Sequence, residues 1–300
     1  MRGQYLKGLW VFGLLVGFVL FIAGCDSPVP RIEAVEEQGR TFAVLDYLTL
    51  VVETANGEVR IRGVDGLDEV QTTVVLHAWG DTQEQAQDRL GQLAVDMSQQ
   101  ADRVQLTFRS SIAYRGWGKS PQVDFELTVP SHADVAVIVK NGSVGVTDIT
   151  GTLSVKADNG VVDAAGVRGA ATIETTNGGI VVALAQAHLG LTADNGSITV
   201  SQSRCSLDAE TDNGDVRFSG QLVGKQHRMK SGNGSVVAEI PADSELAIEA
   251  RVGSGSISTS LPLVGDMQGR QWAAILNAPT SRLILQTGNG AIKIRGLAAT

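Results

Sequence analysis

The chain has 300 residues, among them 35 glycines and 7 prolines, and its formal net charge is −8. This acidic balance argues against nucleic acid and anionic lipid surfaces as partners, because both require a basic face on the protein. Abundant glycine, few aromatic residues and many valine, isoleucine and threonine residues favour short strands joined by tight turns. We therefore expect an all-β protein.

Residues 1–24 have the pattern of a secretory signal peptide, because Arg2 and Lys7 precede an apolar run over residues 8–23. The run ends in the letters IAGC, which resemble the lipobox of bacterial lipoproteins. We therefore expect Cys25 to carry the lipid and residues 25–40 to form a tether. The protein would then lie at the extracytoplasmic face of a cell membrane. The alternative is that the apolar run stays in place as a membrane anchor.

Without the first 24 residues, the chain keeps 22 basic and 32 acidic residues, which is a net charge of −10. We expect the remainder, residues 41–298, to be a single domain. It opens with YLTLVVETANGEVRIRG (47–63), which reads as two alternating strands around an Asn-Gly turn. Further strands are predicted near residues 70–79 and 104–108.

One helix is predicted between these strands, over residues 81–99. Asp81 and Glu84 have the spacing of a capping box that begins a helix. Four apolar residues then recur at helical intervals on one face: Ala86, Leu90, Leu93 and Met97. We expect this amphipathic helix to cover the first coils and their unpaired strand edges.

Residues 133–222 contain five regular repeats of 18 residues. Each repeat carries an Asn-Gly turn between two strands in which apolar and polar residues alternate. The turn residues are Asn141, Gly142, Asn159, Gly160, Asn177, Gly178, Asn195, Gly196, Asn213 and Gly214. We assign them a structural role, because Asn and Gly tolerate the left-handed backbone of a tight corner.

A fixed period of this size is typical of stacked repeats. Because the apolar positions recur in register, we expect a right-handed parallel β-solenoid of about nine coils, with about 18 residues per coil and two sheets. The alternative is a series of local hairpins, in which Asn-Gly forms a type I′ turn. Beyond residue 213 the spacing lengthens, and residues 261–279 read as a loop that returns to a closing coil.

Taken together, the lipobox, LVVETANGEVRIRG, the Asn-Gly coils and the terminal ILQTGNGAIKIRG resemble the putative adhesin family of bacterial surface proteins. The resemblance covers residues 42–297 and implies a β-solenoid. It implies no catalytic residues. The segment 111–121 is not part of the family pattern.

Two pairs of acidic residues are candidate sites. Asp194 and Asp212 lie one repeat apart, close enough to share a Ca²⁺ ion, although each could simply hydrogen-bond its own turn. Glu174 and Glu210 lie two repeats apart, which is about 9.6 Å at the strand spacing and near the upper limit for an inverting glycosidase. The structural alternative for Glu174 is an ordinary cross-strand ion pair with Lys156. We favour the structural interpretation of both pairs, so no metal, cofactor or catalytic residue is predicted.

Two other features bear on function. Cys205 is interpreted as a buried structural thiol, because it opens a coil where other repeats have Gly or Ala. The segment SIAYRGWGKSP (111–121) is a candidate contact loop for a partner. Its side chains of interest are Tyr114, Arg115, Trp117 and Lys119. The alternative is that Trp117 folds back as a lid on the first coils.

These observations predict a non-enzymatic, lipid-anchored protein of the cell envelope. Its β-solenoid would act as a scaffold for adhesion or for binding an envelope protein or a glycan. The alternatives are an accessory protein for envelope-stress sensing, a polysaccharide-processing enzyme and a purely structural spacer.

Overall fold

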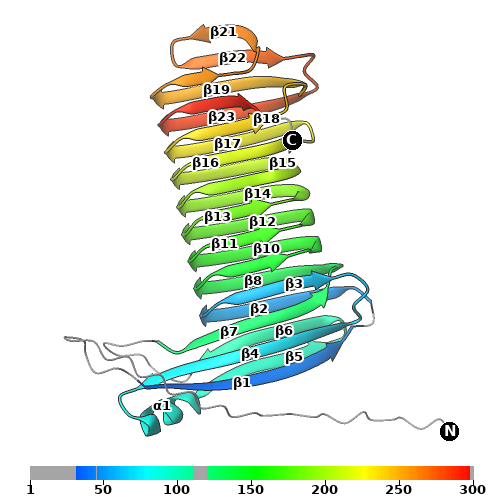
Figure 1. The fold of residues 1–300 in the computed structure, drawn as a ribbon, viewed down its shortest axis with the longest axis vertical. Helices are drawn as coiled ribbons and strands as arrows, with labels where there is room; N and C mark the ends of the chain where they lie inside the picture. The colour runs from blue at the N-terminus through cyan, green and yellow to red at the C-terminus, as the bar shows by residue number, and fades with distance from the viewer. Residues whose placement is uncertain (1–31, 45, 111–119, 298–300) are drawn as a thin grey trace, which may run out of the picture.

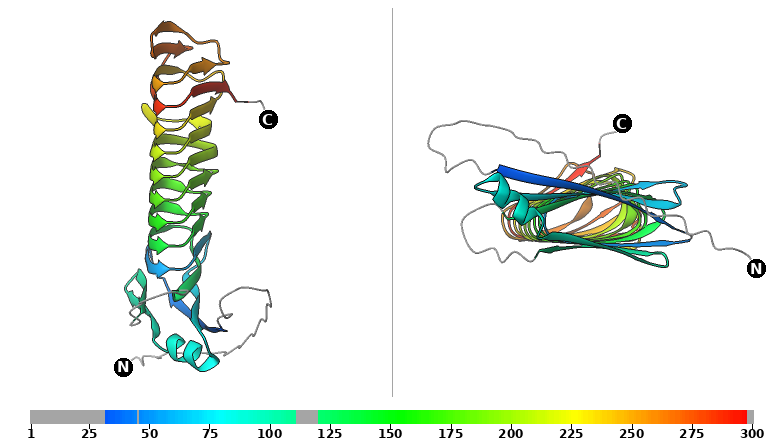
Figure 2. Two further views of the ribbon diagram at one scale, coloured as in Figure 1. Left: turned by 90° about the vertical axis from the view of Figure 1, so that its left-hand side faces the viewer. Right: turned by 90° about the horizontal axis from the view of Figure 1, so that it is seen from below.

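The part of the chain that the structure describes is a long stack of β-strands with one short helix at one end (Figure 1). The structure, a computed structural model, describes residues 32–44, 46–110 and 120–297. Figure 2 shows that successive turns of the chain superpose on a flattened outline. The prediction of an all-β protein is confirmed.

The elements in the first half of the chain are β1 (Ile32–Ala43), β2 (Leu48–Asn56), β3 (Val59–Val64), β4 (Glu69–Gly80), α1 (Gln83–Leu90), β5 (Leu93–Gln100), β6 (Arg103–Ser110), β7 (Gln122–Pro130), β8 (Ala133–Asn141), β9 (Val144–Thr147), β10 (Thr150–Asn159) and β11 (Val162–Ala165). The second half contains β12 (Arg168–Asn177), β13 (Ile180–Ala183), β14 (Gln186–Asn195), β15 (Ile198–Asn213), β16 (Val216–Leu222), β17 (Gln226–Asn233), β18 (Val236–Ile240), β19 (Leu246–Ser254), β20 (Ile257–Thr259), β21 (Val264–Gln268), β22 (Gln271–Leu276), β23 (Ser281–Asn289) and β24 (Ile292–Gly296).

Strand pairing defines two faces of the stack. Face A runs through β1, β4, β7, β3, β9, β11, β13, β15, β16, β18, β24 and β20. Face B runs through β5, β6, β2, β8, β10, β12, β14, β15, β17, β23, β19, β22 and β21. The long strand β15 contributes to both faces. The regular repeats pair in parallel, each strand with its equivalent 18 residues away.

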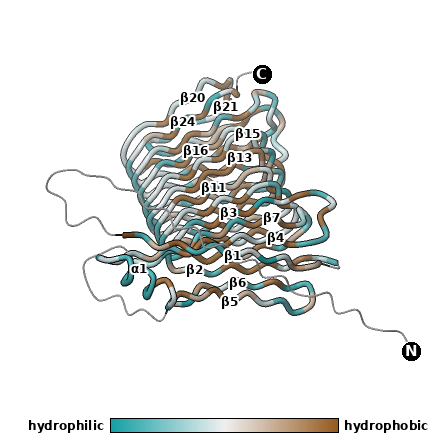
Figure 3. Tube along the Cα trace, turned by 60° about the horizontal axis from the view of Figure 1, so that its bottom comes forward, coloured by the Kyte–Doolittle hydropathy of each residue, from teal (hydrophilic) through white to brown (hydrophobic). Residues whose placement is uncertain are grey.

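The interior is built from apolar columns that run through the stack. On face B, one column passes through Val135, Leu153, Ala171, Leu189 and Leu207, all of which are buried. Figure 3 shows hydrophobic residues recurring along the stacked strands. The columns form because period-two alternation directs every second side chain inward, and the equal repeat length keeps equivalent residues in register.

A ladder of asparagine side chains follows one corner of the stack. Asn177 donates from Nδ2 to Oδ1 of Asn159 at 3.0 Å, and Asn195 donates to Asn177 at 3.1 Å. The same bond links successive residues in the ladder Asn56, Asn141, Asn159, Asn177, Asn195, Asn213, Asn233 and Asn289. The predicted turn residues therefore do lie at one corner, where the amide side chains satisfy one another from strand to strand.

The predicted tether over residues 25–40 is wrong from residue 32 onward. Residues 32–43 form β1, which pairs antiparallel with β4 along its whole length. Most of its side chains are partly or fully exposed, because β1 is the edge strand of face A. An exposed edge strand needs no clear apolar alternation, so its sequence looks like a linker. The folded part of the chain therefore begins before residue 41.

The predicted helix over residues 81–99 is wrong in its second half. The helix α1 ends at Leu90, and β5 follows from Leu93 to Gln100, paired antiparallel with β6. Leu93 and Met97 are four residues apart, which suits one face of a strand as well as one face of a helix. The segment forms a strand because its backbone pairs with the edge of β6. The N-cap is Thr82, whose side chain accepts a hydrogen bond from the backbone N–H of Gln85.

The helix α1 contacts β4 and β1 at the end of the stack, where Ala86 and Leu90 are buried. No helix within the described residues is both long enough and apolar enough to span a membrane.

The terminal coil, β23 and β24, does not close the stack as the sequence predicts. β23 lies between β17 and β19 on face B, and β24 lies between β18 and β20 on face A. The last strands in the chain are therefore inserted into the stack. The end of the stack is formed instead by β19, β20 and the hairpin of β21 and β22 (Figure 1).

His77 on β4 joins three strands of face A through its two ring nitrogens. Its Nδ1 lies 2.8 Å from Glu33 on β1, and its Nε2 lies 3.3 Å from Asp124 on β7. The hydrogen bond with Asp124 is the main cause of a raised pKa for His77, although partial burial opposes it. Burial opposes ionisation of Asp124 as well, but hydrogen bonds from His77, from the Glu58 N–H and from Gln122 lower its pKa to about 2.

We expect this contact to make stability depend on pH. Because the folded-state pKa of His77 lies above its ordinary value of 6.5, its stabilisation is complete below that value and is lost as pH rises through the folded-state pKa. Replacing His77 with glutamine should lower the free energy of unfolding by roughly 1–2 kcal/mol near pH 6, since charge-assisted hydrogen bonds are lost. The difference should shrink in alkaline solution.

Urea unfolding of both proteins across this pH range measures the effect. The variant Glu33→Gln should reproduce part of the loss, because it removes the charge next to Nδ1. A His77→Gln effect that stays constant from acidic to alkaline pH would show that protonation of His77 contributes no stability.

Candidate functional site

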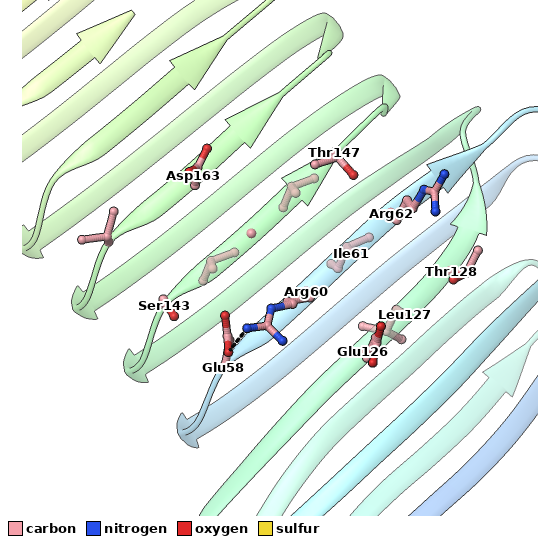
Figure 4. Close-up of a pocket in the computed structure, with 14 residues that line it drawn as sticks. Glu58, Arg60, Ile61, Arg62, Glu126, Leu127, Thr128, Ser143, Thr147 and Asp163 are labelled. Atoms are coloured by element: carbon pink, nitrogen blue, oxygen red, sulfur yellow. Dashed lines mark ion pairs between the residues drawn. The ribbon is translucent and has the colours of Figure 1, made fainter.

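A polar groove crosses face A where the first coil meets the regular repeats. It has a volume of about 630 Å³ and lies over four neighbouring strands, β7, β3, β9 and β11. Figure 4 shows its labelled side chains, which lie on the outer surface apart from Ile61 and Leu127, two buried residues beneath the groove. The outward residues that line it are Glu58, Arg60, Arg62, Glu126, Thr128, Ser143, Gly145, Thr147, Val161 and Asp163.

The strand register arranges these side chains in rows across the groove. Glu126, Arg60, Gly145 and Asp163 are successive partners on the four strands. At the strand spacing, Arg60 and Asp163 stand about 9.6 Å apart with the glycine between them. Because Gly145 has no side chain, the row has a gap there. A Cβ at this position would meet only Cγ of Arg60, at 4.0 Å, so the gap is open space.

The groove contains charges that the protein itself leaves available. Arg60 pairs with Glu58 at 2.7 Å. Within the described parts of the chain, no ion pair is found for Arg62, Glu126 or Asp163, and all three side chains are exposed. One guanidinium, two carboxylates and the hydroxyl groups of the lining can therefore hydrogen-bond a polar ligand without first breaking a contact.

The lining does not assemble a nucleophile with a base. Among the described residues that line it there is no histidine or cysteine, and its serine and threonine hydroxyls lie on an open surface. Acyl or glycosyl transfer requires a nucleophile or acid whose pKa is tuned by its surroundings.

The two glutamates considered as a glycosidase pair occupy the expected places on face B. Thr192 lies between Glu174 and Glu210 in the strand register, so the two are separated by two strand spacings. The ion pair between Lys156 and Glu174 is confirmed, at 3.8 Å.

Glu210 also has basic partners. It accepts hydrogen bonds from Lys230 and, at 2.8 Å, from Arg228, and the bond with Lys230 is the main cause of its lowered pKa. A general acid needs a raised pKa, so these contacts argue against acid catalysis by Glu210.

The two aspartates considered for calcium lie at equivalent, exposed positions on β14 and β15. Within the described residues, no group of three or more His, Cys, Asp or Glu side chains is placed to hold a metal ion. Asp194 and Asp212 are solvent-exposed and directly precede the corner residues Asn195 and Asn213.

Cys205 is buried, as the sequence predicts, and burial raises the pKa of its thiol to about 12. The thiol is therefore protonated and unreactive at neutral pH. Cys25, the predicted site of lipid attachment, lies outside the described residues, as do the residues of the predicted contact loop, Tyr114, Arg115, Trp117 and Lys119.

The groove residues were not predicted from the sequence. Arg60 and Arg62 do alternate with Val59 and Ile61, which marks them as outward residues of a strand. However, the two strands on either side of β3 are distant from it in sequence. β7 begins 58 residues after β3 ends, and β9 lies further still along the chain. The only local signal is Gly145, a glycine in an outward position where the other regular repeats have larger residues.

The stacked strands and the open groove define an all-β repeat protein with polar side chains in a groove on its outer surface. Within that class, the chain belongs to the Toastrack DUF4097 family, which it matches over residues 47–295. No curated protein matches the chain significantly.

Several solved structures resemble the fold at low identity. A putative adhesin from Parabacteroides distasonis is 14% identical, with a TM-score of 0.43, and the match covers 86% of this chain and 96% of that one. A putative adhesin from Bacteroides fragilis gives 14% identity, a TM-score of 0.42 and the same coverage. A putative lipid binding protein from Parabacteroides distasonis gives 12% identity, a TM-score of 0.24 and coverage of 85% and 96%.

Proposed function

We propose that the protein is a non-enzymatic, lipid-anchored protein of the cell envelope whose right-handed parallel β-solenoid, of about nine coils and two sheets, binds a partner through the groove on face A. The partner is an envelope protein or a glycan. Cys25 carries the lipid and holds the protein at the extracytoplasmic face of the membrane. Adhesion and envelope sensing would both begin with this binding step.

One observation carries the proposal: Arg62, Glu126 and Asp163 line the groove without an ion pair among the described residues, and Asp163 borders the gap at Gly145. Exposed charges that are already paired must lose that pairing when they bind a ligand, whereas these three need only be desolvated. The membership in the Toastrack DUF4097 family and the lipobox-like IAGC are consistent with an envelope protein.

The test is a crosslinking pull-down of the intact protein from its own envelope. A variant with Arg60→Ala and Arg62→Ala should recover about tenfold less partner than the parent protein, or even less. A loss of this size is expected when arginines at an interface are truncated. The matched control is Lys293→Ala with Arg295→Ala. These two residues stand in the same columns of face A, further along the stack, and should leave recovery unchanged.

A second variant fills the groove without removing any charge. Gly145→Trp has room for its Cβ and should block binding, whereas Gly190→Trp on face B, where a Cβ also has room, should not. Equal recovery by all four variants would exclude the groove as the binding surface. Polysaccharide hydrolysis that is lost in Glu174→Gln or Glu210→Gln would instead establish an enzyme.

Lipid anchoring is tested separately. The protein should incorporate labelled palmitate and partition with membranes, and Cys25→Ser should do neither. A Cys25→Ser variant that still incorporates palmitate would contradict the assignment of Cys25.

A further inference from the structure

The end of the stack opposite α1 is closed by a hairpin whose outer strand is an open edge. Within the described part of the chain, β21 pairs only with β22, which in turn pairs with β19 (Figure 1). The backbone N–H and C=O groups on the outer side of β21 thus have no strand partner. Such an edge is a template for one more strand.

The hairpin is held in place by contacts at its turn. Gly269, with φ at +61°, and Arg270 form a two-residue turn of the kind that joins antiparallel strands. Arg270 donates from its guanidinium to the carbonyl oxygen of Gly253, and its own carbonyl oxygen accepts from Val252 at 3.0 Å. The open edge is therefore fixed relative to β19.

The same hairpin exposes apolar side chains on its outer surface. Val264 on β21 is 71% exposed, and its strand partner Ile275 on β22 is 44% exposed. Together with Ala247 on β19 they form one row across a shallow hollow of about 510 Å³. An arriving strand would extend this row and cover Val264.

The charge on β21 decides which kind of strand fits. Asp266 lies at the centre of the strand, is exposed, and has no ion pair among the described residues. A second copy that paired all five residues of β21 in antiparallel fashion would place Asp266 opposite Asp266. Like charges directly opposite each other destabilise a strand pair, whereas opposite charges stabilise it. The edge therefore selects against a second copy and in favour of a strand with a basic residue at this position.

We propose that β21 is a docking edge for an extended peptide segment of another protein, which adds as a further strand of face B. The segment places a lysine or arginine opposite Asp266 and an apolar residue beside Val264. Main-chain hydrogen bonds supply the affinity, and the alternating side chains supply the selectivity. This interaction is independent of the groove on face A.

The test compares two short peptides of alternating threonine and valine, one with lysine and one with glutamate at its centre. Fluorescence anisotropy with the full chain should show the lysine peptide binding about fivefold more tightly than the glutamate peptide. Asp266→Lys should reverse that preference. In hydrogen exchange, the bound lysine peptide should protect β21 amides of the parent protein.

The control is Asp163→Lys, an equivalent change in the groove, which should leave both affinities unchanged. The proposal is overturned if Asp266→Lys does not alter the preference between the peptides or if Asp163→Lys alters it equally. It is also overturned if ultracentrifugation shows a dimer whose formation excludes the peptide, because a second copy would then occupy the edge. Loss of groove binding in the pull-down affects none of these results.

Discussion

Gly178→Ala should destabilise the protein by about 3 kcal/mol or more, because a side chain at this corner overpacks a rigid backbone. A Cβ on Gly178 would lie 1.7 Å from the carbonyl oxygen of Gly160 in the neighbouring repeat. Gly160 is itself held, since its N–H donates to the carbonyl oxygen of Asn177 at 3.0 Å. Neither backbone can move without breaking the pairing of the strands that it connects.

The matched control is Gly190→Ala, in the middle of β14. A Cβ there would meet its nearest atom, Oγ1 of Thr172, at 3.9 Å, which is ordinary contact. This change should alter the free energy of unfolding by no more than about 1 kcal/mol, because it acts mainly by reducing the conformational entropy of the unfolded chain. Urea unfolding followed by circular dichroism measures both variants. Equal midpoints for the two would show that the corner is not as tightly packed as the structure indicates.

Removing the terminal coil, residues 279–300, should unfold the end of the stack formed by β19 to β22. These strands precede the deleted residues in the chain but pair with the stack through them. β23 joins β17 to β19, and β24 joins β18 to β20. The coil also contributes four fully buried side chains: Leu283, Leu285, Ile292 and Ile294. Their burial stabilises the stack by roughly 6 kcal/mol or more in total, at about 1.5–3 kcal/mol for each.

Hydrogen exchange can locate the loss. In the truncated protein, the amides of residues 246–276 should exchange freely. Within the described chain, β22 pairs with β19 and β21, and β19 is paired to the rest of the stack only by β23. The regular repeats from β8 to β14 should stay protected. Retained protection over residues 246–276 would mean that the end of the stack does not depend on the terminal coil.

An internal deletion provides the control. Removing residues 160–177 joins Asn159 to Gly178, so it preserves an Asn-Gly corner while it deletes one whole repeat. The neighbouring repeats carry apolar residues in the same columns and can pair with each other. This deletion is of similar length, yet we expect it to cost far less stability than loss of the terminal coil.

The errors of the sequence-based prediction have a common physical origin. Residues 32–40 resemble a linker, and Leu93 to Met97 resemble a helix face, because their local patterns fit more than one structure. The edge of β4 and the edge of β6 then resolve these ambiguities by pairing. The groove on face A was also beyond prediction, since Arg60 acquires its neighbours Glu126 and Gly145 only when β3 lies between β7 and β9.

The sequence by itself determined the all-β class, the 18-residue period, the inward columns and the Asn-Gly corners. These depend on residues that are close together in the chain, on alternation with a period of two and on the backbone freedom of Asn and Gly. The tertiary structure alone decided the order in which the strands stack. Strands that share the same alternation and the same Asn-Gly corner could pair with one another equally well, so local sequence does not set their order. Packing of the whole stack places β23 beside β17 and leaves β21 as an open edge.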